Sequence, residues 1–81
     1  MRVEVKAPNL GEEGPKEMYI SFWMFEVGDS VSEGEDLVEL VTDKANFTVA
    51  SPASGRLVEV RVNEGDKVNP DDVLAVVESN E

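Results

Sequence analysis

Few side chains in this sequence can carry covalent chemistry. Its 81 residues include neither cysteine nor histidine, which excludes thiol nucleophiles, imidazole acid–base catalysis and the usual zinc ligands. No disulfide can form, and a redox role would need sulfur supplied by a cofactor. Carboxylates are numerous, but most fall at predicted turns or outward-facing strand positions, so an enzyme is poorly supported. The amines of four lysines remain.

The four lysines have different predicted settings. Lys6 belongs to a predicted strand, Lys16 to a predicted insertion, and Lys67 to a Gly-Asp turn. Lys44 lies in the segment Thr-Asp-Lys-Ala, and this lysine alone is expected at the tip of a tight hairpin. Because a lone exposed lysine is usually a solvated surface charge, the significance of Lys44 depends on the elements that position it.

Those elements have the pattern of β-strands. Apolar residues recur with a period of two in segments 3–5, 21–26 and 57–62, which is typical of strands with one face toward a core. Gly-Asp, Asn-Pro-Asp and Ser-Pro turn signals separate them at short intervals, and no segment carries a sustained helical stripe. The sequence predicts one small all-β domain spanning residues 1–81.

An internal repeat refines this prediction. Gly-Asp-Ser-Val at 28–31 matches Gly-Asp-Lys-Val at 65–68, an offset of 37 residues, and Val-Lys-Ala-Pro at 5–8 matches Val-Ala-Ser-Pro at 49–52, an offset of 44. The difference of seven residues places an insertion within about Glu12 to Tyr19. Neither half could bury its apolar face alone, so the repeat predicts two sheets related by an approximate twofold axis in a flattened barrel or sandwich.

The repeat also places the turn from Thr42 to Ala45. Its equivalent in the second half falls at the chain end, around Ser79. The turn should therefore form a hairpin at one end of the molecule, with both termini at the opposite end. Asp43 suits such a turn through hydrogen bonds from its side chain to the backbone, and Lys44 would be exposed at the tip.

Aromatic and branched residues at equivalent positions are predicted to form the core. Trp23 superposes on Val60 and Phe25 on Val62 under the 37-residue offset, and all four are expected to point inward. Phe47, in the strand after the hairpin, is also expected to pack inward.

The net charge of −11 excludes one large class of partner. Without a basic patch, nucleic acid is not an expected ligand; the charge either maintains solubility or steers the protein toward basic partner surfaces. No apolar run approaches the roughly 18 residues of a membrane span, and the chain shows no signal-peptide pattern at Met1. We expect a monomer located in the cytoplasm of a bacterium or archaeon, or in the mitochondrial matrix of a eukaryote.

With these features in register, the chain resembles the lipoyl domains of 2-oxo acid dehydrogenase complexes over nearly its whole length, from Val3 to about Val77. The residues that carry the resemblance are Gly28-Asp29, Glu33-Gly34, Leu37, Thr42-Asp43-Lys44-Ala45, Ser51-Pro52, Gly55 and Glu64-Gly65-Asp66. The Asp-Lys-Ala turn alone would be a weak signal, whereas in register with both Gly-Asp turns it is specific.

The resemblance implies two four-stranded antiparallel sheets and a lipoyl group in amide linkage to Lys44. The domain would be a carrier, part of a longer dihydrolipoamide acyltransferase (E2) chain. Its arm would visit a thiamine diphosphate-dependent decarboxylase (E1), the E2 catalytic core and the flavoprotein dihydrolipoyl dehydrogenase (E3). A lipoate ligase or lipoyl transferase would attach the cofactor, and Thr42, Asp43 and Ala45 would shape the turn or be recognised with it.

The inserted segment would contribute to partner recognition, because in the family it lies beside the lipoyl hairpin and helps the decarboxylase to recognise it. The candidate residues are Gly11, Glu12, Glu13, Gly14, Glu17 and Met18. The chain departs from many family members at Glu17-Met18, where Glu-Gly or Glu-Ala is common, and at Thr48, where glutamate is common. These departures put partner specificity in doubt and leave the carrier function unaffected.

Three alternatives are weighed against this interpretation. A biotin carrier shares the fold but places methionine on both sides of its lysine, where this chain has Asp43 and Ala45. The glycine-cleavage carrier is a longer chain with helical elements. An unmodified interaction module would leave Lys44 merely exposed. The Thr-Asp-Lys-Ala turn slightly favours pyruvate or branched-chain complexes over the 2-oxoglutarate complex.

Overall fold

Eight short strands follow one another along the chain in the computed structural model, which describes residues 1–12 and 14–80. The strands are β1 (Arg2–Lys6), β2 (Met18–Trp23), β3 (Ser30–Val31), β4 (Asp36–Thr42), β5 (Asn46–Ala50), β6 (Gly55–Val60), β7 (Lys67–Val68) and β8 (Val73–Ser79). The described residues form no helix, so none of them could cross a membrane as one. The predicted all-β class is confirmed.

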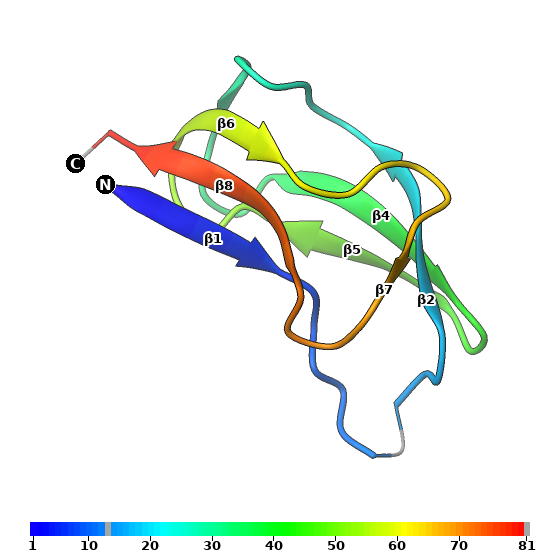
Figure 1. The fold of residues 1–81 in the computed structure, drawn as a ribbon. Coiled ribbons are helices and arrows are strands. Elements are labelled where there is room, and N and C mark those ends of the chain that lie inside the picture. Colours follow the sequence, from blue (N-terminus) through cyan, green and yellow to red (C-terminus); the bar gives the residue numbers. More distant parts are fainter. Residues whose placement is uncertain (13, 81) are drawn as a thin grey trace.

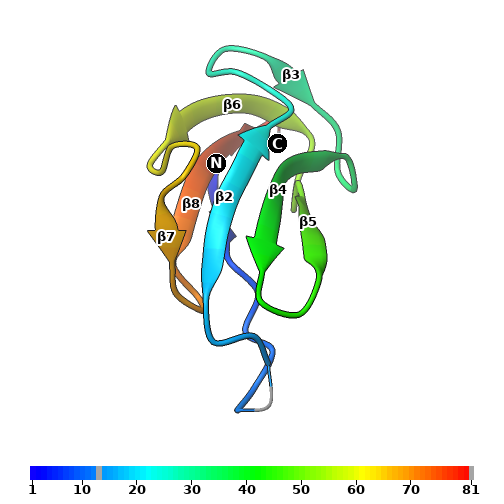
Figure 2. The same cartoon turned by 90° about the vertical axis from the view of Figure 1, so that its right-hand side faces the viewer.

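The strands form two four-stranded sheets that pack face to face (Figures 1 and 2). One sheet has the order β1-β8-β6-β3 and the other β5-β4-β2-β7, and the neighbouring strands pair in antiparallel fashion. Both termini lie at one end of the molecule, and the β4–β5 hairpin lies at the other (Figure 1). The sandwich, and the separation of the hairpin from the termini, agree with the sequence predictions.

The approximate twofold symmetry is visible in individual hydrogen bonds. The N–H of Ile20 donates to the carbonyl of Asp66, and at the equivalent position the N–H of Leu57 donates to the carbonyl of Asp29, both at 2.9 Å. The two donors differ by 37 in residue number, and so do the two acceptors. Because independent backbone contacts obey the same offset, the repeat describes the fold as well as the sequence.

The two Gly-Asp turns are held by the same device. Gly28 and Gly65 have positive φ values of 102° and 87°, a conformation that costs glycine little. The following aspartate folds its carboxylate back over the turn: Asp29 accepts from the N–H of Glu26, and Asp66 does so from Asn63, each at 2.8 Å. These bonds explain why each turn needs this residue pair.

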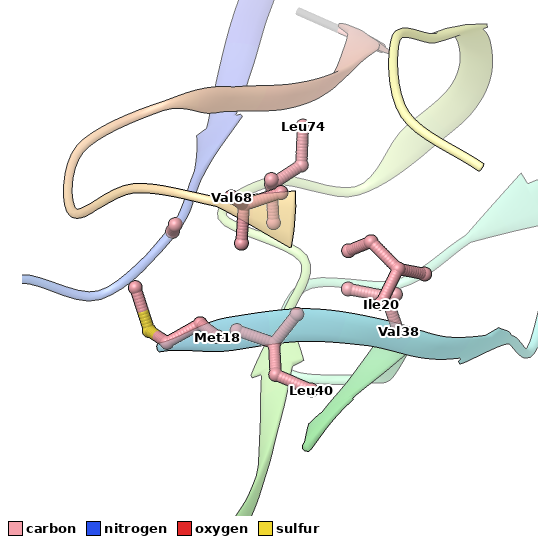
Figure 3. Packing of buried hydrophobic residues seen from close by; sticks show 7 residues of the cluster. Met18, Ile20, Val38, Leu40, Val68 and Leu74 are labelled. Carbon is pink, nitrogen blue, oxygen red and sulfur yellow. The ribbon is translucent and has the colours of Figure 1, made fainter. Parts of the chain in front are cut away.

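Two apolar clusters fill the space between the sheets. The first, shown in Figure 3, comprises Ala7, Met18, Ile20, Val38, Leu40, Val68 and Leu74, and the second comprises Val5, Val31, Leu37, Leu57, Ala75 and Val77. Leu37 and Val38 are consecutive, yet both are fully buried and belong to different clusters. An irregularity in the β4–β5 register at this point lets neighbouring residues both face inward.

Register shifts also correct part of the core prediction. Strand β2 shifts register between Ile20 and Phe22 and ends at Trp23, so strict alternation does not continue to residue 26. Trp23, like the equivalent Val60, is only partly buried and packs against the clusters. The indole N–H of Trp23 donates to the carbonyl of Val62 at 3.0 Å, which satisfies its polar atom at the edge of the core.

Two further core predictions have different outcomes. Phe25 and Val62 are also partly buried and pack at the margins of the clusters, so they are core-edge residues and not fully buried ones. Phe47 is half-buried and pairs directly with the buried Leu40. Since paired residues of an antiparallel ladder share a face, Phe47 points inward as predicted.

Candidate functional site

Lys44 is exposed at the turn between β4 and β5, as the sequence predicts. The two strands pair up to Val41 and Asn46, immediately before the turn. On its other edge β4 pairs with β2, and this pairing continues to the contact between Met18 and Thr42. The hairpin therefore projects from a strand that is hydrogen-bonded on both edges, so the sheet restrains the backbone on which Lys44 lies.

The side chain of Thr42 closes this turn. Its hydroxyl oxygen accepts hydrogen bonds from the N–H groups of Lys44 and Ala45, at 3.2 and 2.9 Å. The same hydroxyl donates to the carbonyl of Ala45. These contacts satisfy backbone groups that a tight turn would otherwise leave to solvent. Thr42 thus fixes the backbone around Lys44.

Asp43 does not have the turn-forming role that the sequence suggests for it. Its carboxylate oxygen Oδ1 accepts a hydrogen bond from the backbone N–H of Lys16 at 3.1 Å. The partner lies 27 residues earlier in the chain, in the inserted segment between β1 and β2. Asp43 consequently links the hairpin to that segment, while Thr42 forms the turn.

The segment between β1 and β2 is called the insertion loop below, and its described residues, 9–12 and 14–17, are held by local hydrogen bonds. The side-chain amide of Asn9 donates to Asp71 at 2.9 Å, and the carbonyl oxygen of the same amide accepts from the N–H of Gly11 at 3.1 Å. A further bond at 3.1 Å, from the N–H of Gly14 to the carbonyl of Gly11, closes a turn within the loop.

Both glycines of the insertion loop are needed for this path. Gly11 has a φ of +80°, which favours glycine. At Gly14 an added Cβ would lie 2.7 Å from the Cβ of Leu10, a contact that requires movement of the backbone. The glycines, predicted as recognition residues, therefore shape the loop.

The other predicted recognition residues are divided by the structure. Glu12 and Glu17 are exposed in the insertion loop, and the carboxylate of Glu17 accepts a hydrogen bond from the hydroxyl of Tyr19 at 3.3 Å. Glu13 lies outside the described residues. Met18 is 2% exposed and belongs to the first core cluster (Figure 3), so its side chain cannot contact a partner. Its inclusion in the recognition set is corrected.

The remaining lysines have different surroundings from Lys44. Lys6 ends β1, and its amine lies 3.9 Å from the carboxylate of Glu4. Lys67, predicted to lie inside a turn, instead begins the two-residue strand β7. Lys16 is exposed in the insertion loop. Of the four lysines, Lys44 alone occupies a hairpin turn between two long paired strands.

The outer face of the other sheet carries compensated charge. Arg2 and Glu78, on neighbouring strands, lie 3.7 Å apart, and Arg61 forms an ion pair with Glu59. The hydrogen bond that the Arg61 guanidinium donates to Glu59, together with the negative charge of Glu59, raises the pKa of the exposed Arg61 above its usual value. Exposed pairs of this kind contribute little stability, and none of these residues belongs to the hairpin.

Comparison with known proteins identifies the family. The family model described as "Biotin-requiring enzyme" matches residues 3–77. The succinyltransferase component of the 2-oxoglutarate dehydrogenase complex of Staphylococcus saprophyticus is 49% identical over 74 residues, which are 91% of this chain and 17% of that protein. The acetyltransferase component of the pyruvate dehydrogenase complex of Acholeplasma laidlawii is 36% identical over 93% of this chain and 14% of its own length.

A solved structure agrees with these sequence matches. The solution structure of the lipoyl domain of the 2-oxoglutarate dehydrogenase complex from Azotobacter vinelandii superposes with a TM-score of 0.74, at 29% identity, covering 96% of this chain and 99% of that one. The chain spans less than a fifth of the curated relatives described above. Because succinyl- and acetyltransferase components both match, the preference for pyruvate or branched-chain acids stays a prediction. The chain belongs to the biotin- and lipoyl-carrier family, as a lipoyl domain of the kind found in the acyltransferase components of 2-oxo acid dehydrogenase complexes.

Proposed function

We propose that Lys44 is the lipoylated residue, and that the domain carries acyl groups and reducing equivalents within a 2-oxo acid dehydrogenase complex. Its partners would be the E1 decarboxylase, the E2 catalytic core and the E3 dihydrolipoyl dehydrogenase. The observation that carries this proposal is the position of Lys44 on a turn closed by Thr42, at the opposite end from both termini (Figure 1).

The residues at the turn suit attachment of a lipoyl group. In this reaction the side-chain nitrogen of Lys44 attacks the carbonyl carbon of an activated lipoyl carboxyl group and releases a proton. The C–N bond of an amide then forms, and the activating group leaves with the electrons of the bond that it shared with the acyl carbon. Modification removes one positive charge, which changes the formal net charge from −11 to −12.

The bound lipoyl group supplies the disulfide–dithiol chemistry that a chain without cysteine lacks. The contribution of this chain is to present the lipoyl group on a rigid support. The paired strands β4 and β5 hold the attachment point still, and the lysyl and lipoyl chains together would form a long arm beyond it. An arm of this kind reaches active sites on the same assembly at a high effective concentration.

The insertion loop is part of the proposed recognition surface. It is hydrogen-bonded to the hairpin through Asp43, and its exposed carboxylates Glu12 and Glu17 lie on the segment joined to the modified turn. An enzyme that receives the arm would meet both elements together. The acidic net charge of the chain favours a partner surface with basic residues around its active-site entrance.

The attachment site is tested by intact-mass measurement after expression with lipoate and a lipoate ligase. We expect one lipoyl adduct, located on Lys44 by peptide mapping. The variant Lys44→Arg should show no adduct, and the matched control Lys67→Arg should retain it. An adduct that persists in Lys44→Arg would disprove the site, and a biotin adduct in its place would disprove the cofactor.

The carrier role is tested with purified decarboxylases specific for different 2-oxo acids. The lipoylated domain alone should show no turnover, and it should accept an acyl group only from its cognate enzyme. Rates measured across pyruvate-, branched-chain- and 2-oxoglutarate-specific enzymes identify the acyl group. If no enzyme of this class acylates the lipoylated domain, the carrier role in a 2-oxo acid dehydrogenase complex is disproved.

A further inference from the structure

Two adjacent side chains at the hairpin, those of Thr42 and Asp43, form hydrogen bonds to different segments of the chain. The hydroxyl of Thr42 bonds to the backbone of its own turn. The carboxylate of Asp43 instead accepts from the N–H of Lys16, in the insertion loop. The turn is therefore closed without Asp43, and the contact made by Asp43 joins two separate segments of the chain.

We propose that Asp43 is a positioning residue that holds the insertion loop against the lipoyl hairpin, so that the decarboxylase meets the loop and the arm in one fixed arrangement. This inference rests on the proposed function of the domain. It assigns Asp43 an action through Lys16, in place of direct recognition by the ligase or the decarboxylase, and it leaves the shape of the turn to Thr42.

The geometry of the loop supports this role, because the loop is fixed near both of its ends. At the start, the side-chain amide of Asn9 is bonded to Asp71, in the turn before β8. Near the end, the N–H of Lys16 is bonded to Asp43. The first contact positions the loop relative to β7 and β8. The second connects described residues of the loop with the hairpin that bears Lys44.

The donor to Asp43 is the backbone N–H of Lys16, which affects how the loop can specify a decarboxylase. A main-chain N–H is available whatever side chain stands at position 16, unless that residue is proline. The exposed side chains of the loop can therefore differ between lipoyl domains while the loop keeps its place beside the arm. Asp43 would provide the constant geometry, and residues such as Glu12 and Glu17 would provide the variable surface.

Paired variants at the two ends of the hydrogen bond test the inference. Asp43→Ala removes the acceptor, whereas Asp43→Asn keeps an oxygen at the same position and removes the charge. Lys16→Pro removes the donor without altering Asp43, and Lys16→Ala keeps the donor and removes the side-chain amine. These variants separate the hydrogen bond from both charges.

The first measurement is amide hydrogen exchange in the unmodified domain. In Asp43→Ala the N–H of residue 16 should exchange about fivefold faster, as expected for the loss of one net hydrogen bond, while the amides of Lys44 and Ala45 keep their rates because Thr42 protects them. Asp43→Asn and Lys16→Ala should stay near the parent rate. An unchanged rate at residue 16 in Asp43→Ala would overturn the proposed contact.

The second measurement is reductive acylation of the lipoylated domain by the cognate decarboxylase. Asp43→Ala and Lys16→Pro should each raise KM about fivefold with little change in kcat, Asp43→Asn should restore most of the loss, and the double variant should be no worse than either single one. Equal defects in Asp43→Asn and Asp43→Ala, or additive effects in the double variant, would mean that the partner reads the Asp43 charge directly.

The failure of this inference can be distinguished from the failure of the proposed function. Lipoylation of Lys44 is followed by mass in every variant, and it should proceed within about twofold of the parent rate because the turn is intact. If no variant and no parent protein becomes lipoylated, the proposed function fails, while the exchange measurement on the unmodified protein still decides the role of Asp43.

Discussion

The hairpin end and the terminal end of this domain are built on one repeated framework, but they differ in what the framework carries. At the hairpin end β4 and β5 are joined by the turn around Lys44; at the terminal end their equivalents β8 and β1 hold the two chain ends. The insertion loop exists only at the hairpin end. The elements proposed for lipoyl attachment and partner recognition are thus those that depart from the repeat, while the repeated elements support them.

Equivalent positions show how far the two ends have diverged. Met18 pairs with Thr42 and Val68, and its equivalent Gly55 pairs with Ser79 and Val31. Met18 contributes a buried side chain to the first core cluster. At Gly55 an added Cβ would lie only 1.8 Å from the carbonyl oxygen of Glu78. At the hairpin end Met18 fills the core, whereas at the terminal end Gly55 lets β6 and β8 approach closely.

The largest expected effect comes from adding a methyl group at the terminal end. Gly55→Ala forces Cβ against the backbone of β8, and we expect the free energy of unfolding to fall by about 3 kcal/mol. Urea denaturation followed by tryptophan fluorescence measures this change. A variant as stable as the parent would show that the two strands can separate at low cost and that the ends differ less than the structure indicates.

The complementary change at the hairpin end should cost slightly less. Met18→Ala removes a side chain that is 2% exposed, and we expect a loss of about 2–3 kcal/mol, in the lower part of the range for deletion of a buried methionine side chain. The same denaturation measurement applies. If Met18→Ala is neutral in stability but weakens acylation by the decarboxylase, Met18 would belong with the recognition residues after all.

A smaller effect is expected at the turn itself. Thr42→Val keeps the shape of the side chain and removes the hydroxyl that holds the turn, which should cost about 1–2 kcal/mol and slow the lipoylation of Lys44. Thr42→Ser should retain both stability and modification. The matched control Thr48→Val, at an exposed position of β5, should change stability by less than about 0.5 kcal/mol.

The smallest change in stability is expected at two equivalent turn positions that have positive φ values. Gly34 has φ +89° and Asp71 has φ +67°, and the N–H of each donates to a carbonyl of the matching segment, Ser51 or Ala7. Gly34→Asp should cost about 1 kcal/mol. Asp71→Gly should change stability by less than about 0.5 kcal/mol, because relief of strain offsets lost chain stiffness.

Asp71→Gly should still loosen the start of the insertion loop, although the free energy of unfolding hardly changes. It removes the acceptor for Asn9, so amide exchange should accelerate at Gly11, whose N–H bonds to Asn9. Unchanged exchange at Gly11 would mean that the start of the insertion loop is held by other contacts.

The sequence predicted the framework well because the repeat contains long-range information. Matches at two fixed offsets set the pairing of the halves, and the absence of a second-half equivalent for the turn at Lys44 placed that turn opposite the termini. The predicted alternation over 21–26 was wrong because a single register shift in β2 changes which residues face inward. No local pattern indicates such a shift.

The roles of individual site residues were harder to predict. An aspartate in a turn usually bonds to its own backbone, yet Asp43 bonds to a group that is 27 residues away, and only the folded path of the insertion loop brings that group close. The position of Met18 also depended on where the insertion ends. Because β2 begins at Met18, its side chain belongs to the core and not to the loop surface.

The pairing of the two chain ends has a mechanical consequence. The N–H of Ser79 donates to the carbonyl of Met1 at 2.7 Å, and β1 runs antiparallel to β8, so any tether attached at either terminus leaves from the same end of the molecule. A tension applied between the two ends would load this strand pair in the unzipping direction, one hydrogen bond after another. The hairpin at the opposite end would lie outside the line of force, so the lipoyl arm proposed on Lys44 would not be loaded while the tethers are stretched.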